Sequence, residues 1–78
     1  MDINTFIKKF KEQFELLDEG EVILSDTVFQ EIDGWDSLTA LMILEMIDDE
    51  FDADISGDEL RACVTIENLY NLSVSKSS

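Results

Sequence analysis

Apolar side chains recur every three or four residues in two segments of this chain, and this helical spacing constrains the fold more than any other sequence feature. In the first segment they fall within an arc about 100° wide on a helical wheel, at positions Ile3, Phe6, Ile7, Phe10, Phe14 and Leu17. In the second they spread over one half of the wheel, at positions Ala40, Leu41, Ile43, Leu44, Ile47 and Phe51. The spacing predicts helices over residues 3–17 and 37–51 that bury these faces in one core.

Short polar side chains mark where the predicted helices begin. Asp2 and Asp36 precede the two long helices, and each can accept hydrogen bonds from the unpaired N–H groups of a first helical turn. Thr65 can cap a last helix over residues 65–73, whose apolar positions are Ile66, Leu69 and Leu72. One further helical turn is predicted at residues 58–62.

Residues 20–36 lack a sustained helical period and are rich in Gly, Asp, Ser and Thr, so they are predicted to form a long ordered loop. A loop of this length in a compact domain is often functional. The helix before it is expected to end at residues 18–20, with its lysines in the first half, where positive charge opposes the helix dipole. Six apolar residues are expected to anchor the loop to the core: Val22, Ile23, Leu24, Val28, Phe29 and Ile32.

No alternating apolar pattern is long enough for a sheet, so the predicted fold class is all-α. A chain of 78 residues can bury only one core, and we expect a single domain over residues 1–74 with a frayed tail at 75–78. The sequence has no apolar run long enough to predict a membrane span. Its N-terminus lacks the basic and apolar segments of an export signal, so a cytoplasmic location is expected.

Negative charge dominates the composition. The chain carries 19 acidic and 5 basic side chains, which gives a net charge of −14. No lysine or arginine occurs between Glu12 and Leu60. Such a surface repels nucleic acid and anionic membranes and favours partner proteins with basic patches.

Histidine and the glycine-rich nucleotide-binding motifs, on which many enzymes depend, are missing from this sequence. The chain has no histidine, which removes the commonest general base and the familiar nucleophile pairs. Its glycines are scattered, so it has neither a P-loop nor a dinucleotide-binding fingerprint. The single cysteine, Cys63, cannot form an internal disulfide or a zinc site, and we expect it to be a small buried side chain. The chain is therefore not expected to be an enzyme or to bind a metal.

Residues 34–38, with the sequence GWDSL, lie where the long loop meets the second long helix. A serine hydroxyl in a first helical turn is accessible, and the unpaired N–H groups beside it favour an attached anion. Together with DEF at residues 49–51 and TIE at residues 65–67, this segment resembles the phosphopantetheine attachment region of acyl carrier proteins. The resemblance extends over residues 3–74.

The resemblance implies a four-helix bundle of the acyl-carrier type, with three main helices, one short helix and a long first loop. It implies that Ser37 bears a covalent 4′-phosphopantetheine arm, whose thiol carries acyl intermediates as thioesters in a fatty acid, polyketide or specialised lipid pathway. Asp36 would help to position the metal used during arm transfer, besides capping the helix. The implied partners of a monomeric carrier are a phosphopantetheinyl transferase and acyl-loading and acyl-processing enzymes.

Partner enzymes with basic and apolar patches are expected to contact the helix that follows Ser37; the expected contacts are Trp35, Leu38, Thr39, Met42, Met46, Asp48 and Asp49. Thr39 and Met42 are neutral where the family is typically acidic, so an apolar strip formed by Leu38, Met42 and Met46 is expected to face water. Two alternatives stay open. The methionines could pack as core, and Trp35 could anchor the loop instead of contacting a partner.

Residues 52–63 allow a competing interpretation as a calcium-binding EF-hand loop. The run DADISG at their start matches the opening of that motif. Leu60 and Cys63, however, occupy the ninth and twelfth positions, so the set of oxygen ligands falls short. A third interpretation, an acidic module that covers a basic protein surface, explains the charge but gives Ser37 no role.

Overall fold

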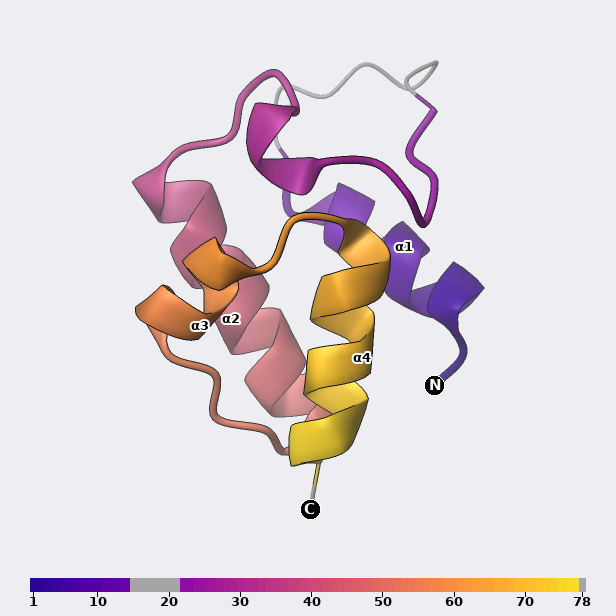
Figure 1. Cartoon of the computed structure of the whole chain (residues 1–78), viewed down its shortest axis with the longest axis vertical. Coiled ribbons are helices and arrows are strands. Elements are labelled where there is room, and N and C mark those ends of the chain that lie inside the picture. The colour runs from indigo at the N-terminus through magenta and orange to yellow at the C-terminus, as the bar shows by residue number, and fades with distance from the viewer. Residues whose placement is uncertain (15–21, 78) are drawn as a thin grey trace.

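The computed structural model describes residues 1–14 and 22–77 and folds them into four α-helices (Figure 1). The elements in chain order are α1 (Ile3–Glu12), the 3-10 turn η1 (Phe29–Glu31), α2 (Ser37–Phe51), α3 (Gly57–Ala62) and α4 (Ile66–Lys76). The described residues form no strand, only one isolated antiparallel bridge between Val28 and Thr65. The predicted all-α class, with three main helices and one short one, is confirmed. No helix in this part of the chain is long and apolar enough to cross a membrane.

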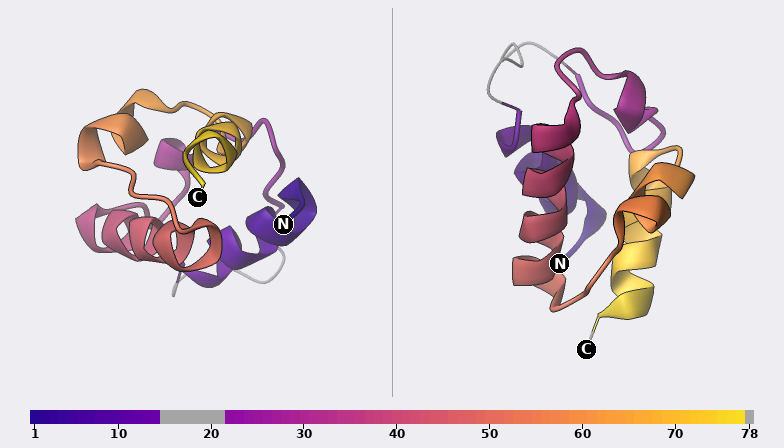
Figure 2. Two further views of the ribbon diagram at one scale, coloured as in Figure 1. Left: turned by 90° about the horizontal axis from the view of Figure 1, so that it is seen from below. Right: turned by 90° about the vertical axis from the view of Figure 1, so that its left-hand side faces the viewer.

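The three main helices enclose a common core. Each of α1, α2 and α4 contacts the other two, and the short α3 packs on α2. The view along the bundle shows α3 on the side of α2 and α4 that lies away from α1 (Figure 2). The fully buried apolar side chains come from all three helices and from the loop; they are Phe6, Phe10, Phe29, Ile43, Ile47, Ile66 and Leu69.

The predicted helix caps are confirmed. Asp2 accepts a hydrogen bond of 2.8 Å from the N–H of Thr5, and Asp36 accepts one of 2.8 Å from the N–H of Thr39. Thr65 forms a reciprocal capping pair with Asn68. The start of α3 has a similar pair, between residues 56 and 59, which the sequence analysis missed although its S-x-x-E pattern is a known signal.

Helix α1 is shorter than predicted. It ends at Glu12, and the side-chain amide of Gln13 donates to the carbonyl of Lys9 at 3.0 Å, which satisfies part of the last turn. Residues 15–20, where the helix was expected to continue and end, lie outside the described residues. The expectation that the lysines oppose the helix dipole is wrong, because Lys9 and Lys11 lie in the last turn, where positive charge is favourable.

The described part of the long loop, residues 22–36, is tied to α4 by its backbone. The carbonyls of Thr27 and Ser25 accept hydrogen bonds from the N–H groups of Ile66 and Glu67, at 3.1 and 2.8 Å. Two of the unpaired donors at the start of α4 are thereby satisfied. Of the six expected anchors, Ile23 and Phe29 are buried and Val28 and Ile32 are half-buried. The other two, Val22 and Leu24, are wrong, since they are exposed.

Helix α4 runs past the predicted end at residue 73. It continues to Lys76, whose amine lies 2.6 Å from a carboxylate oxygen of Glu59 in α3. The expectation of a frayed tail from residue 75 is therefore wrong for Ser75 and Lys76, because this contact and the favourable position of a cation in a last helical turn support the end of the helix. The contact also joins α3 to α4.

Two apolar residues of α2 should respond differently to truncation. Ile47 is fully buried, whereas Leu41, which was expected to face the core, is 64% exposed. Ile47→Ala should lower the free energy of unfolding by about 2–5 kcal/mol, because it leaves a cavity. Leu41→Ala, the matched control, should change it by less than about 0.5 kcal/mol. Chemical denaturation measures both values, and equal losses would contradict the orientation of α2.

Candidate functional site

A tight turn delivers the chain from η1 to the start of α2. Gly34 adopts a φ of +95°, which is unfavourable for residues with a side chain. The N–H of Trp35 donates to the carbonyl of Ile32 at 3.0 Å and closes the turn. The glycine of the GWDSL segment is thus explained by the backbone conformation that places the following residues at the helix end.

Trp35 anchors this junction in the core. Its ring centroid lies 5.2 Å from that of Phe29 in an edge-to-face arrangement, 6.1 Å from that of Phe14 and 6.4 Å from that of Phe10. Such ring pairs add to the stabilisation from buried area. Of the two roles considered for Trp35, the structure shows the packing role. The side chain stays half-buried, so part of it also remains at the surface.

Asp36 caps α2 and is held in its charged form. The hydrogen bond from the backbone N–H of Thr39 to its Oδ1 lowers the pKa of Asp36 below the ordinary value, because this bond favours the carboxylate. The side chain is exposed. A fixed negative charge therefore lies next to Ser37 at neutral pH.

Ser37 is the first residue of α2 and is exposed. Its hydroxyl makes no hydrogen bond within the described parts of the chain, and the N–H groups of the first turn lie beside it. This position of Ser37, in the first turn of α2, agrees with the prediction from the sequence. An enzyme can reach the hydroxyl without disturbing the core.

A groove opens beside Ser37 between α2 and α3. Its volume is about 470 Å³. One wall consists of the apolar side chains of α2, Ala40, Leu41 and Leu44. The opposite wall consists of Gln30 of η1 and of Gly57, Leu60 and Arg61 of α3. Residues 35–37 of the junction also line the groove. Gln30, Leu41 and Arg61 were not predicted from the sequence to belong to the site. Leu41 could have been found, because it follows Leu38 by three residues on the same helix face.

The outer face of α2 agrees only in part with the expected partner surface. Leu38 is 63% exposed, Asp48 and Asp49 are exposed, and Met42 is half-buried. The expectation that Met46 faces water is wrong, because it is only 7% exposed.

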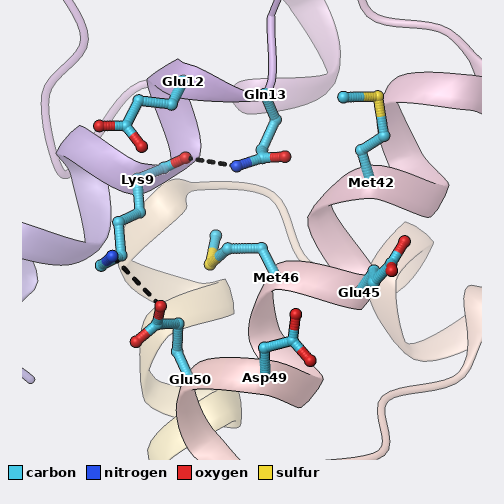
Figure 3. Close-up of a pocket in the computed structure, with 8 residues that line it drawn as sticks. All are labelled: Lys9, Glu12, Gln13, Met42, Glu45, Met46, Asp49 and Glu50. Atoms are coloured by element: carbon cyan, nitrogen blue, oxygen red, sulfur yellow. Dashed lines mark hydrogen bonds and ion pairs between the residues drawn. The ribbon is translucent and has the colours of Figure 1, made fainter.

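Helix α1 accounts for the burial of Met46. In Figure 3 the Met46 side chain points from α2 toward α1, beside the ion pair of 3.1 Å between Lys9 and Glu50. The alternative in which the methionines pack as core is therefore shown for Met46. Met42 lines the pocket between α1 and α2 that Figure 3 shows, and it is half-buried, so part of its surface stays accessible.

Thr39 is also buried rather than available to a partner. Its backbone N–H makes the cap bond to Asp36, and its hydroxyl donates to the carbonyl of Gly34 at 3.4 Å. The expectation of a partner contact at Thr39 is therefore wrong for the chain as it folds here. The residue stabilises the junction that displays Ser37.

Residues 52–63 do not have the form of an EF-hand loop. α3 occupies residues 57–62, where the motif requires an extended turn around the cation. Among the described residues, no group of three or more His, Cys, Asp or Glu side chains could hold a metal ion. Cys63 is buried, as expected, and burial raises the pKa of its thiol, with a smaller contribution from the charge of Glu59. This thiol is therefore protonated at neutral pH and poorly nucleophilic.

Comparison with known proteins supplies the family. A family model described as "Phosphopantetheine attachment site" matches residues 4–72. Comparisons with curated proteins and with solved structures gave no match. The matched residues span all four helices and the junction around Ser37. The chain therefore belongs to the acyl carrier protein family, whose members are non-catalytic carriers with a covalently attached 4′-phosphopantetheine group.

Proposed function

We propose that Ser37 is the attachment residue and that the protein carries acyl intermediates as thioesters between the enzymes of a biosynthetic pathway. The observation that supports this proposal is the exposed hydroxyl at the N-terminus of the 15-residue helix α2, inside the family match. The pathway classes we propose are fatty acid, polyketide and specialised lipid synthesis. We further propose that the carrier acts as a monomer in the cytoplasm.

The residues around Ser37 suit an attached phosphodiester. A negative group at this position faces the first-turn N–H groups of α2, which together with the helix dipole stabilise it by about 0.3–1 kcal/mol. When attached, the group supplies a thiol at the end of a long flexible arm. Because the arm is tethered, the thiol reaches the site of a docked enzyme at a high effective concentration.

Asp36 has a second role in this proposal. The cap bond uses Oδ1, so we expect Oδ2 to face a cation during arm transfer from coenzyme A. The lowered pKa keeps the carboxylate ionised, as a metal contact requires. Two negative groups, the carboxylate and the incoming phosphate, would repel each other, and a divalent cation supplied with the transferase offsets this repulsion.

The partner surface we propose consists of Leu38, Met42, Asp48, Asp49 and the accessible part of Trp35. Its apolar and acidic side chains suit enzymes with apolar and basic patches. Thr39 and Met46 support this surface from beneath, since both are buried. The net charge of −14 steers the carrier toward basic partners from a distance.

Attachment can be tested by intact mass. Incubation of the wild-type chain with a broad-range phosphopantetheinyl transferase and coenzyme A should add the mass of one phosphopantetheinyl group. Ser37→Ala should abolish this gain completely, because the acceptor hydroxyl is gone. The matched control is Ser75→Ala, an exposed serine at the far end of α4, which should keep the full gain. A mass gain that persists in Ser37→Ala would refute the assignment.

The two roles of Asp36 can be separated with two substitutions. Asp36→Asn keeps a capping acceptor but removes the charge, so it should fold as stably as the wild type while accepting the arm about 10- to 100-fold more slowly. Asp36→Ala should show the same loss of rate and also a lower thermal midpoint. If Asp36→Asn is modified at the wild-type rate, the cap is the only role of this residue.

The same pair of proteins tests the lowered pKa. Because hydrogen bonding lowers the pKa of Asp36 in the folded chain, its contribution to stability is present above the ordinary value of 3.8 and disappears as the pH falls through the lowered value. The stability of the wild type relative to Asp36→Asn should therefore decrease in that acidic range. Urea denaturation across the range measures it.

The partner surface can be tested on the transferase itself. Leu38→Glu should raise the KM of the transferase for the carrier by about tenfold or more, because a buried apolar contact at the interface is replaced by a charge. The matched control is Val22→Glu, which adds the same charge at another exposed apolar residue. Equal effects of the two substitutions would show that only net charge matters.

A further inference from the structure

The pattern Asp-x-x-Thr occurs twice in the sequence, at the start of α1 and at the start of α2. In both places the backbone N–H of the threonine donates to Oδ1 of the aspartate at 2.8 Å, from Thr5 to Asp2 and from Thr39 to Asp36. The two cap bonds are therefore equivalent. The two threonine side chains are not, because Thr5 is exposed and Thr39 is only 8% exposed. Capping alone does not explain why the Thr39 hydroxyl is buried.

The hydrogen bond of the Thr39 hydroxyl is also of an unusual kind. A hydroxyl removed from water destabilises a fold unless a hydrogen bond compensates for the lost hydration. Among the described residues, the buried polar side chains are Thr39 and Ser73. Ser73 donates to the carbonyl of Leu69 at 2.8 Å, the local bond that helical serines commonly make. The Thr39 hydroxyl instead donates to the carbonyl of Gly34 at 3.4 Å, outside its own helix.

The bond to Gly34 joins α2 to the turn that leads to Ser37. Gly34 is the residue of this turn with a φ of +95°. Thr39 holds the turn at two points, because its hydroxyl bonds residue 34 and its N–H bonds the side chain of residue 36. The N–H of Ala40 adds a bond of 2.9 Å to the carbonyl of Asp36. The Ser37 hydroxyl and the carboxylate before it are thereby fixed relative to α2 as one unit.

Close packing does not hold the turn on the side that faces the end of α1. A pocket of about 80 Å³ lies there, and Gly34, Asp36 and Thr39 all line it, opposite Gln13 and Phe14. Well-packed interiors contain few spaces larger than a water molecule, and this one exceeds the roughly 30 Å³ that a water molecule occupies in the liquid. On this side the hydrogen bonds of Thr39 therefore hold the turn in place of packed side chains.

We propose that Thr39 is a positioning residue for attachment of the phosphopantetheine arm, because its hydroxyl fixes the turn that presents Ser37 and Asp36. In this step Ser37 Oγ forms a bond to the phosphorus next to the pantetheine part of coenzyme A. The diphosphate bond breaks, adenosine bisphosphate leaves with the electron pair, and the hydroxyl proton passes to a base of the transferase. The attacking and leaving oxygens must lie roughly in line, so a small displacement of Ser37 lowers the rate. The inference rests on attachment at Ser37 and adds a residue that governs its rate from beneath the surface.

Kinetics of the transferase with three carrier variants test this role. Thr39→Val keeps the branched shape but removes the hydroxyl, so kcat should fall about tenfold while KM changes less than about twofold, because the partner surface is intact. Thr39→Ser keeps the hydroxyl and should restore kcat to within about twofold of the wild type. Thr5→Val is the matched control, since it removes the hydroxyl at the equivalent position of α1 and should leave both constants unchanged.

Three kinetic outcomes would overturn the role of Thr39. One is a wild-type kcat for Thr39→Val at a temperature where circular dichroism shows that the variant is folded. Another is a kcat for Thr39→Ser as low as that for Thr39→Val, because loss of the hydroxyl is then not the cause. The third is a rise of KM with kcat unchanged, which indicates a damaged partner surface.

Proton NMR of the wild-type apo chain tests the hydrogen bond without a substitution, so it decides the matter even if Thr39→Val does not fold. A buried hydroxyl proton donated to a carbonyl exchanges slowly with water. The Thr39 hydroxyl proton should therefore be observable in water, with a nuclear Overhauser effect to the α protons of Gly34. The exposed Thr5 hydroxyl should exchange too fast to be observed. An unobservable Thr39 hydroxyl proton would contradict the bond and, with it, the positioning role.

The proposed attachment and the role of Thr39 fail in different ways. If the wild-type chain gains no mass with transferase and coenzyme A, the proposed attachment fails, and the positioning role fails with it. If the wild type gains the mass on Ser37 but Thr39→Val is modified with the same kcat, only the positioning role fails.

Discussion

The ring of Phe10 connects the parts of the molecule that display Ser37. It is fully buried and lies within 6.5 Å, between ring centroids, of rings from α1, from η1 and from the junction before α2. Its neighbours are Phe6, Phe14, Phe29 and Trp35. Aromatic side chains bury large areas and restrict one another's orientation. The position of Ser37 relative to the bundle is therefore set by a helix 25 residues or more before it in sequence.

Local signals predicted much of this structure. The helical spacing of apolar residues located α2 and most of α4, and the caps at Asp2, Asp36 and Thr65 marked their starts because a cap depends on only a few neighbouring residues. The exposed serine at the start of α2 followed from the same signals. These features are determined within one or two helical turns.

The features that the sequence analysis missed depend on contacts between distant segments. The helical spacing placed Leu41 on the core face of α2 and Met46 on its outer face, but α1 covers Met46 and leaves Leu41 exposed. The spacing within α2 carries no information about which side α1 occupies. Gln30 reaches the carbonyl of Arg61 across 31 positions of sequence. Helix α4 extends because Lys76 meets Glu59 of another helix. Such contacts between distant segments depend on the path of the loop before α2. The sequence of that loop has no apolar periodicity from which its path could be predicted.

The hydrogen bonds between the loop and the start of α4 have a consequence for the order of events during synthesis. The carbonyls of Ser25 and Thr27 meet their donors, the N–H groups of Glu67 and Ile66, only after the ribosome has released α4. Until then the loop that leads to Ser37 lacks these partners. The loop that leads to Ser37 is thus fully held only when α4 has docked, so we expect a chain whose α4 is undocked to be a poorer substrate for the modifying enzyme.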